Sequence, residues 1–517
     1  MKLNLITKPV LTIIPSITLI PIIINILLGI HFGGISAILE FVRSSISPSL
    51  DPIIIASAWS GIQVTFSIAF ISWLFSLIIG IFLGLISSDL FSYIYNLPIS
   101  ISKIIRFLLL IPRSIHELIW GLILLQIFGL NPYVAIISIV IPFSCLMAKI
   151  TRSQLEVLGK DGIITLKKIG ASKNAILISG IIPKMMPIII RHGGYRLECA
   201  LRSAILLGIF GLGGIGNELK LSIYSLNFDE MWTYLWTLCL VMIILERVVM
   251  IIQKVDWYRL ESHKIWKIHS IIILFLILCL YSISEYDLTI FANKPLQHID
   301  LINIKELYKA LNDLNLIKLS SETLTLTILA SGIAIGMPPM IISLWPTKLG
   351  QELFRFCWLI CRLIPIPLSA FLFLLCINPS IYLAALALGI NNMGIMGRLI
   401  LDSINKEKND IYDSINGTGA NRKSALIYGK LSAASSTYLA YSAYRVEVIL
   451  KETAIIGVVG GAGLGWQLQE SLSSFAWGEV YIITIFFSII TIVGEFLSDK
   501  LQNRFRIKDE ALSSVIT

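Results

Sequence analysis

Charged side chains lie inside apolar segments at two places in this sequence, in the same pattern. Glu198 precedes Arg202 by four positions, and Glu447 precedes Lys451 by four, so each acid can pair with a base one helical turn later. Charges within a membrane span are costly and usually face the bundle interior or a water-filled path. An arginine two positions before each acid points elsewhere and is a candidate for facing an anionic solute. The pathway candidates are Arg196, Glu198, Arg202, Arg445, Glu447 and Lys451.

The alternative explanation is that all six charges form structural pairs between helices, and it accounts for the pattern equally well.

Glycines are concentrated at the end of the same two segments. Gly211, Gly213 and Gly216 satisfy the spacing G-x-G-x-x-G, but no strand precedes them, and the second segment has Ala462 at the middle position. The spacing therefore does not predict a dinucleotide-binding loop. Glycine here favours close backbone packing or a sharp turn at the mouth of a path. The predicted glycine hinges are Gly208, Gly211, Gly214, Gly216, Gly457, Gly460, Gly463 and Gly465.

Both features belong to one stretch that the chain contains twice. The stretch beginning at Gly170 reappears at Gly419, 249 positions later, and the same offset relates Tyr195 to Tyr444 and extends without a gap through the glycines. A shared offset across many special residues indicates duplication of a unit of about half the chain. We therefore predict two domains, residues 1–260 and 261–517, each a membrane-spanning half.

The composition is that of a membrane protein. The chain has 517 residues, 56% hydrophobic and only 14% charged, with a mean hydropathy of +0.83. Soluble domains carry roughly 25% charged residues, so a polytopic membrane protein is predicted. The net charge of +9 fits the excess of Lys and Arg on the cytoplasmic side of such proteins, and nucleic acid is not expected as a partner. The seven cysteines show no disulfide or metal-ligand spacing, so neither a metal nor a cofactor is predicted.

Apolar runs of about 20 residues predict an all-α protein with about twelve transmembrane helices, about six in each half. Lys and Arg cluster between spans on one side, which the positive-inside rule assigns to the cytoplasm together with both termini. Residues 285–319 are expected outside the cytoplasm, with a helix over 304–314. The predicted spans are residues 11–30, 62–85, 107–128, 133–147, 185–210, 232–252, 269–283, 324–344, 356–376, 381–396, 435–459 and 480–497.

The repeated stretch opens with a predicted cytoplasmic helix–turn–helix. Glycine is preferred just past a helix end, which predicts helix ends at Gly170 and Gly419. Ser172 and Asn421 follow at the same repeat position, and both are good N-caps for the next helix. Two different capping residues at one position indicate that both copies form the turn.

This turn resembles the cytoplasmic loop of binding-protein-dependent ABC importer permeases, whose pattern is Glu-Ala-Ala, then a glycine, then Leu-Pro. The first copy keeps the glycine and Pro183 but has ITL at the Glu-Ala-Ala positions; the second keeps Asp413 as the acid and replaces the proline by Ser432. In that family the loop is a short coupling helix in a groove of the ATPase subunit. The resemblance therefore implies two contacts with the ATPase, at similar places in the two halves but of different strength. The implied docking residues are Gly170, Ala171, Ser172, Pro183, Asp413, Gly419, Ala420 and Asn421.

The segments YRLE, RSAILLG and GLGGIG in the first half, with YRVE, KETAIIG and GGAGLG in the second, resemble the permease of phosphonate-type ABC importers. RSIHELIW from Arg113 and its copy RLIPIPLS from Arg362 extend the resemblance, although His116 corresponds to Pro365. Members of that family usually carry one such unit per chain, so two units are fused here. The resemblance implies the type I importer permease fold.

The chain has no G-x-x-x-x-G-K-[ST] motif, so it is not expected to be an enzyme, and a partner must hydrolyse ATP. The resemblance implies a permease subunit in the bacterial inner membrane, in contact with lipid. It also implies two copies of a cytoplasmic ABC ATPase and an extracytoplasmic solute-binding protein as partners. The implied solute is a phosphonate or a similar phosphorus oxyanion.

Two alternatives remain open at this point. One is an importer of another solute such as ferric iron, because permeases of that kind also fuse two such units. The other is an ion-coupled secondary transporter, which expects carboxylates inside spans, and Glu117 is such a carboxylate. That class, however, does not need paired cytoplasmic helix–turn–helix loops.

Overall fold

The structure is a computed structural model that describes residues 13–157, 160–254, 262–286, 304–406, 410–457 and 462–516. Within these ranges the regular structure is helical, apart from one isolated bridge between Ile30 and Ile377. The all-α prediction is confirmed. The chain divides into two compact units, Phe41–Leu301 and Met1–Glu40 with Ile302–Thr517.

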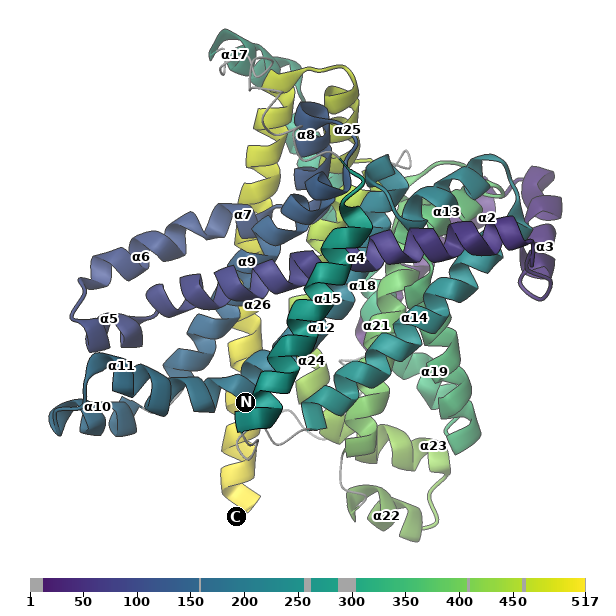
Figure 1. Ribbon diagram of the computed structural model, residues 1–517. Coiled ribbons are helices and arrows are strands. Elements are labelled where there is room, and N and C mark those ends of the chain that lie inside the picture. The colour runs from purple at the N-terminus through teal and green to yellow at the C-terminus, as the bar shows by residue number, and fades with distance from the viewer. Residues whose placement is uncertain are drawn as a thin grey trace. The chain divides into compact units, whose positions relative to one another are not determined.

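The unit Phe41–Leu301 is built around the 35-residue helix α4, which packs along α9 (Figure 1). Ser76, Gly80 and Gly84 recur at every fourth position of α4, and these small residues let α9 approach closely. The helices of this unit are α3 (Ile35–Ser44, whose first part precedes the boundary), α4 (Pro52–Ile86), α5 (Asp89–Tyr95), α6 (Ile99–Leu108), α7 (Leu110–Ser114), α8 (Glu117–Phe128), α9 (Pro132–Val157), α10 (Lys160–Lys168), α11 (Lys173–Ala175), η3 (Ile176–Ile181), α12 (Ile182–Leu207), η4 (Gly208–Leu212), α13 (Ile215–Tyr224), α14 (Phe228–Lys254) and α15 (Ser262–Ile283).

The other unit is centred on α18, which packs along α21, and on α24, which packs along α26. The fully buried Tyr438 joins the two pairs, because its hydroxyl on α24 donates to the Ile335 carbonyl on α18 at 2.7 Å. The helices of this unit are η1 (Ile14–Thr18), α2 (Leu19–Gly29), η2 (Phe32–Gly34), α17 (Ile304–Asp313), α18 (Leu316–Leu344), α19 (Lys348–Leu363), α20 (Ile366–Leu374), α21 (Ile381–Lys406), α22 (Asp410–Gly417), α23 (Arg422–Ala425), η5 (Leu426–Leu431), α24 (Ser432–Gly457), α25 (Leu464–Ser473) and α26 (Trp477–Ile516).

The sequence repeat is also a repeat of helices. α9 and α21, α13 and α25, and α14 and α26 each begin 249 positions apart. In both copies a π-helical segment, η3 or η5, lies between the short helix after the docking turn (the turn at Gly170 or Gly419) and the long helix that carries the charges. The helix α17 begins at the predicted Ile304, so the expected helix over 304–314 is confirmed.

The first apolar span of each half joins the compact unit that contains the other half's remaining spans. η1 and α2 pack against α18 and α21, and the Asn378 N–H donates to the Gly29 carbonyl at 3.0 Å. α15 packs against α4, where the Phe275 ring meets Phe66 and Phe70 edge-on at 5.6 and 5.0 Å. The compact units therefore do not follow the residue 260/261 boundary, which stays a prediction about the sequence repeat.

Seven helices of the described ranges are long and apolar enough to cross a membrane, or up to nine if each of two bent helix pairs is one span. Two shorter apolar helices, Ile14–Gly29 and Ser270–Ile283, cover the predicted first spans. α24 is less apolar because it carries the charged residues, and it occupies the predicted span 435–459. The helices therefore agree with about twelve spans, and the chain is a multi-pass membrane protein.

The predicted third span of each half is broken rather than straight. The helix pairs Ile99–Ser114 with Glu117–Phe128, and Leu349–Leu363 with Ile366–Leu374, bend by 80° and 90°. In the second half Pro365 disfavours a helical conformation at the preceding residue. In the first half His116 acts instead, because its Nδ1 accepts the Leu118 N–H at 3.1 Å and starts a new helix. Two different residues produce the same break.

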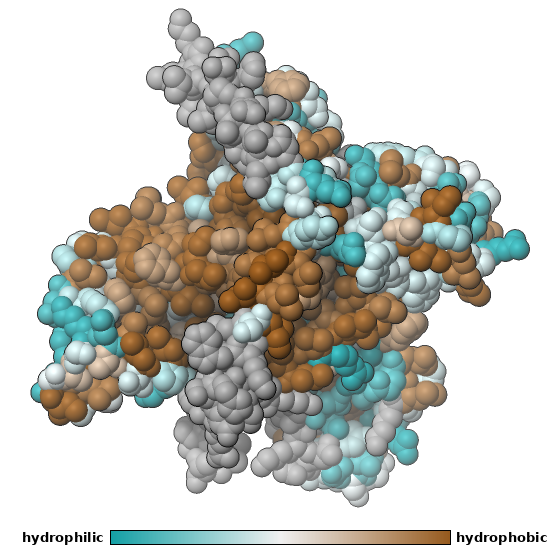
Figure 2. Space-filling view, viewed as in Figure 1, coloured by the Kyte–Doolittle hydropathy of each residue, from teal (hydrophilic) through white to brown (hydrophobic). Residues whose placement is uncertain are grey.

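The two copies differ most in length after α4 and α18. Thr65 and Thr323 occupy the same place on these helices but are 258 positions apart, against 249 for the rest of the repeat, so the first copy has nine extra residues. The extra segment contains α5, whereas α19 of the second copy corresponds to α6 and α7 at the offset of 249. α6 turns Ser102 inward and exposes Ile104 and Phe107, and Figure 2 shows apolar surface over it. Such a face suits contact with lipid chains.

Candidate functional site

In the second copy, Arg445 of α24 belongs to a buried polar cluster. Its Nε donates to Oδ1 of Asn392 on α21 at 2.5 Å, and its Nη2 lies 3.2 Å from Oε1 of Glu452. Asn392 Nδ2 also donates to Glu452 Oε2 at 2.6 Å, so three side chains hold one another. Arg445 is 4% exposed, and a carboxylate balances its charge inside the bundle. Asn392 and Glu452 were not predicted from the sequence. The available signal was the spacing of seven residues, two helical turns, between Arg445 and Glu452.

In the first copy, the matching Arg196 of α12 has aromatic neighbours. Phe143 stands at the position of Asn392, and Ser203 at that of Glu452. The Arg196 guanidinium lies 5.7 Å from the Phe143 ring centroid and 5.5 Å from that of Tyr195. Cation–π contacts of this kind favour a buried cation, and Arg196 is 7% exposed. The two arginines thus occupy the same repeat position in different chemical surroundings.

A second buried cluster in the first copy contains Glu117. Ser203 Oγ donates to Glu117 Oε1 at 2.6 Å, and His116 Nε2 lies 3.5 Å from Glu117 Oε2. Because His116 accepts the Leu118 N–H at Nδ1, a neutral ring carries its proton on Nε2, facing the carboxylate. A carboxylate therefore lies at the same repeat position in both copies. In the first copy Glu117 of α8 reaches Ser203, and in the second copy Glu452 of α24 itself stands at the position that corresponds to Ser203.

The predicted acid–base pairs one turn apart are both formed. Glu198 Oε1 accepts from Arg202 Nη2, and Lys451 Nζ lies 2.9 Å from Glu447 Oε1. None of the four side chains is more than 26% exposed. Each pair lies within one helix, as the spacing of four residues predicts.

The glycine-rich segments form a close backbone crossing. In the first copy a Cβ at Gly208 would lie 2.6 Å from the Gly213 carbonyl oxygen, and one at Gly216 would lie 2.2 Å from that of Ile205. In the second copy a Cβ at Gly457 would lie 2.1 Å from the Gly465 carbonyl carbon. The predicted close packing is therefore confirmed, whereas movement at a hinge stays a prediction. Gly211, Gly214 and Gly463 have φ of +94°, +80° and +89° in the turn before the next helix, and Gly460 lies outside the described residues.

Two threonines hold these turns against the second span of each half. The Ile215 N–H donates to Thr65 Oγ1 at 2.8 Å, and the Leu464 N–H donates to Thr323 Oγ1 at 2.9 Å. In the second copy Glu322 also accepts the Gly463 N–H at 3.0 Å. Sequence reasoning did not find the threonines, because their offset of 258 differs from that of the repeat.

Both docking turns have the predicted helix–turn–helix geometry. Gly170 and Gly419 each have φ of +82°, and no atom lies within 4 Å of a Cβ added at either, so conformation rather than space requires glycine. Ser172 Oγ accepts the Ala175 N–H at 3.3 Å, and Asn421 Oδ1 accepts the Lys423 N–H at 3.4 Å, so both N-caps are confirmed.

The remaining predicted docking residues lie beside these turns. Asp413 is exposed on α22, and Pro183 lies in the first turn of α12, where its missing N–H costs nothing. Ala171 and Ala420 are each partly exposed within the turn. Each turn thus presents an exposed tip that a groove on a partner can enclose.

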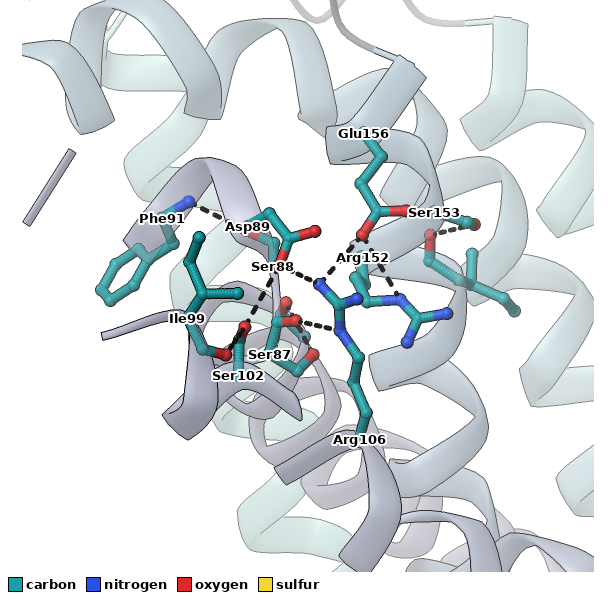
Figure 3. A network of polar contacts seen from close by, with 12 residues as sticks. Ser87, Ser88, Asp89, Phe91, Ile99, Ser102, Arg106, Arg152, Ser153 and Glu156 are labelled. Atoms are coloured by element: carbon teal, nitrogen blue, oxygen red, sulfur yellow. Dashed lines mark hydrogen bonds and ion pairs between the residues drawn. The ribbon is translucent and has the colours of Figure 1, made fainter. Parts of the chain in front are cut away.

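A network of ion pairs lies at the end of α4, next to Ser87 (Figure 3). Arg106 of α6 is 2.6 Å from Asp89 of α5 and 3.3 Å from Glu156 of α9, and its Nε donates to the Ser87 carbonyl at 2.8 Å. Arg152 of α9 lies 3.7 Å from Glu156. The network joins α5, α6 and α9 and was not predicted.

Comparison with known proteins agrees with this geometry. Residues 76–255 match the family model described as binding-protein-dependent transport system inner membrane component. The chain is 18% identical over 437 residues to a phosphate-import permease protein of Mycolicibacterium smegmatis, covering 78% of each chain. It is 27% identical to a putative cryptic phosphonate transport system permease protein of Escherichia coli, over 23% of this chain and 98% of that one. It is 32% identical to a putative phosphite transport system permease protein of Stutzerimonas stutzeri, over 24% and 46%.

No solved structure matches this chain. The family match begins within α4, includes the first docking turn and the charged helix α12, and ends just after α14. The long relative extends the similarity over most of both halves, as a duplicated chain requires. Over residues 76–255 the chain is thus similar to the family of binding-protein-dependent transport system inner membrane components.

Proposed function

We propose that this chain is the membrane subunit of an ABC importer for a phosphonate or a related phosphorus oxyanion. The observation that carries the proposal is the docking turn, which occurs twice with the same backbone conformation in a chain similar to the permease family. The relatives are named for phosphate, phosphonate and phosphite, which share a tetrahedral phosphorus oxyanion. That shared chemistry supports the solute class.

We further propose that two copies of a separate cytoplasmic ATPase dock on the turns at Gly170 and Gly419. ATP-driven closure of the pair would rock the repeated halves and alternate access to the translocation path, as in other transporters built from repeats. A solute-binding protein would deliver the anion from the opposite side of the inner membrane. Both chain termini then lie in the cytoplasm, as the distribution of Lys and Arg predicts.

Co-purification with the ATPase tests the docking proposal directly. Gly170→Asp combined with Gly419→Asp places a side chain with unfavourable φ at both tips, so the variant should lose the ATPase and solute uptake. Gly417→Asp is the matched control, because Gly417 lies in the same loop, has no positive φ and has open space around its Cα. A double variant that retains the ATPase and full uptake contradicts the proposal.

Arg196 is the residue that we propose faces the anion, whereas we assign Arg445 to the cluster with Glu452. Arg196→Ala should lower uptake of a phosphonate into proteoliposomes while the ATPase still assembles. Arg191→Ala is the control, since Arg191 is an exposed cation on the same helix. Equal uptake by the two variants would remove Arg196 from the pathway. Competition among phosphonate, phosphite and phosphate for binding to the solute-binding protein would identify the preferred solute.

A further inference from the structure

The first docking turn is tied to the end of the second span by a helix that the second copy lacks. α5 (Asp89–Tyr95) follows α4 directly and belongs to the segment that is nine residues longer in the first copy. It ends at Asn96, whose left-handed conformation (φ +58°) leaves the last carbonyls of the helix accessible. The docking helices α10 and α11 contact α5 at this end.

Two lysines of the docking helices bind the C-terminal end of α5. Lys167 Nζ donates to the Tyr93 carbonyl and, at 2.9 Å, to Asn96 Oδ1, and it stands 4.0 Å from the Tyr93 ring centroid. Lys173 Nζ donates to the Tyr95 carbonyl at 3.3 Å. Cations are favoured at a helix C-terminus, where the carbonyl dipoles point outward. The lysines of this turn therefore do more than place positive charge on one side of the membrane.

A side-chain hydrogen bond and a buried cluster complete the joint. The Tyr95 hydroxyl donates to Oδ1 of Asn174 on α11 at 3.0 Å. Beneath it, Leu90 and Ile94 of α5 pack with buried residues of α9, α10 and η3. The buried members of this cluster are Leu90, Ile94, Leu155, Ile163, Ile176, Ile181 and Met185.

The other end of α5 is anchored to the membrane helices. Asp89 at the start of α5 pairs with Arg106, which also reaches Glu156 of α9 and the Ser87 carbonyl next to the end of α4 (Figure 3). α5 thus connects the docking helices at one end with α4 and α9 at the other. A packed, ion-paired connection of this kind transmits displacement, because folded interiors are nearly incompressible.

Within the residues that the structure describes, the second docking turn has no such connection. Asn416, Arg422 and Lys423 stand where the first copy has Lys167, Lys173 and Asn174, and their side chains make no hydrogen bond or ion pair with any part of the chain that the structure describes. α18 is followed by Thr347, which caps α19 without a helix between them. Beside the second turn, Tyr412 and Leu426 pack in a core cluster with buried residues of α18, α19, α21 and α24.

We propose that α5 is a strut that makes the first docking turn move as one body with the ends of α4 and α9. This proposal rests on the proposed function, because it names which of the two ATPase contacts drives the membrane helices. Closure of the ATPase pair displaces the ends of α4 and α9 directly through the first turn, whereas the second turn moves in response. Lys167 and Tyr95 are the positioning residues.

The number of solute molecules moved per ATP hydrolysed tests the strut. Lys167→Met with Tyr95→Phe removes the polar contacts of the joint and keeps the side-chain bulk, so the complex should still assemble and hydrolyse ATP. The number of solute molecules moved per ATP should fall by about fivefold, the factor that corresponds to a loss of about 1 kcal/mol. Lys168→Met is the matched control, since Lys168 is exposed, carries the same charge on the same helix and has no bond within the described residues. Lys423→Met tests the second turn. A double variant with the same ratio as Lys168→Met overturns the proposal.

A cross-link provides a readout that does not depend on folding of the double variant. With the exposed Cys357 replaced by serine, Asn96→Cys and Lys167→Cys can be joined by a short thiol-reactive cross-linker. A strut that stays rigid through the cycle predicts full transport after cross-linking. A joint that opens in each cycle predicts a block, and that result would overturn the proposal.

The two proposals fail in different ways. If no ATPase co-purifies with the unmodified chain, the proposed function is wrong. If the ATPase binds and transport is coupled, but neither the double variant nor the cross-link behaves as expected, only the strut is wrong.

Discussion

The two copies of the repeat share a backbone and differ in the chemistry that fills it. Leu226 and Phe475, 249 positions apart, both have a left-handed φ near +55°, so even an unfavourable conformation is kept in both copies. At the buried arginines, by contrast, Asn392 and Glu452 of one copy correspond to Phe143 and Ser203 of the other. The two copies thus keep the same backbone geometry, whereas the side chains around their buried arginines differ.

The largest expected effect falls on what the copies share, the glycine crossing. Gly216→Val or Gly465→Val should each abolish folding or lower stability by more than about 4 kcal/mol, because a Cβ would lie 2.2 Å from the Ile205 oxygen or 2.9 Å from the Thr453 oxygen. Yield of monodisperse protein and the thermal midpoint in detergent measure this. Gly162→Val, with open space around it, is the control, and an equal response of all three would refute the crossing as the cause.

A smaller but unequal effect is expected at the two arginine sites. Glu452→Ala leaves the buried Arg445 without its carboxylate and should cost about 3–5 kcal/mol, as for other broken buried ion pairs. Glu117→Ala should cost about 1–3 kcal/mol, because it removes the carboxylate beside His116 while the Ser203 hydroxyl can still donate to the Cys199 carbonyl at 3.1 Å. Thermal unfolding of both variants in the same detergent gives the comparison. Equal losses would show that the sites are energetically alike despite their different residues.

The docking turns should respond equally and more weakly. Gly170→Ala and Gly419→Ala should each cost about 1–2 kcal/mol, the penalty for a left-handed alanine, since their φ values are the same. Gly417→Ala, which lies in a helical conformation, should be neutral or slightly stabilising. Thermal midpoints of the three variants test this, and a much larger loss at one turn would indicate a contact that the other lacks.

The smallest expected effect is a gain at the shared left-handed residues. Leu226→Gly and Phe475→Gly should each stabilise the chain by at most about 1 kcal/mol, because glycine adopts this conformation without the steric penalty and the two residues are 46% and 63% exposed. Leu226→Ala serves as the control, since alanine keeps the penalty. A loss of stability with glycine would show instead that the exposed Leu226 and Phe475 side chains make a stabilising contact, for example with lipid.

Several features of the site were predictable because they depend on local sequence. Ser172 and Asn421 cap helices through bonds that span two or three residues, and the Glu447–Lys451 pair spans one turn. The clusters around Arg445 and Glu117 were not predictable, because Asn392 and Ser203 reach them from other helices. Thr65 and Thr323 were hidden by the nine-residue difference between the copies.

By itself, the sequence determined that the chain is a duplicated, all-helical membrane protein with two glycine-ended turns, because hydropathy, capping and a constant offset are properties of neighbouring or regularly spaced residues. Only the tertiary structure decided that the first spans join the other half's unit, that each third span is broken, and that α5 ties the first turn to α4 and α9. The physical reason is that these features depend on contacts between segments distant in sequence, which no local pattern records.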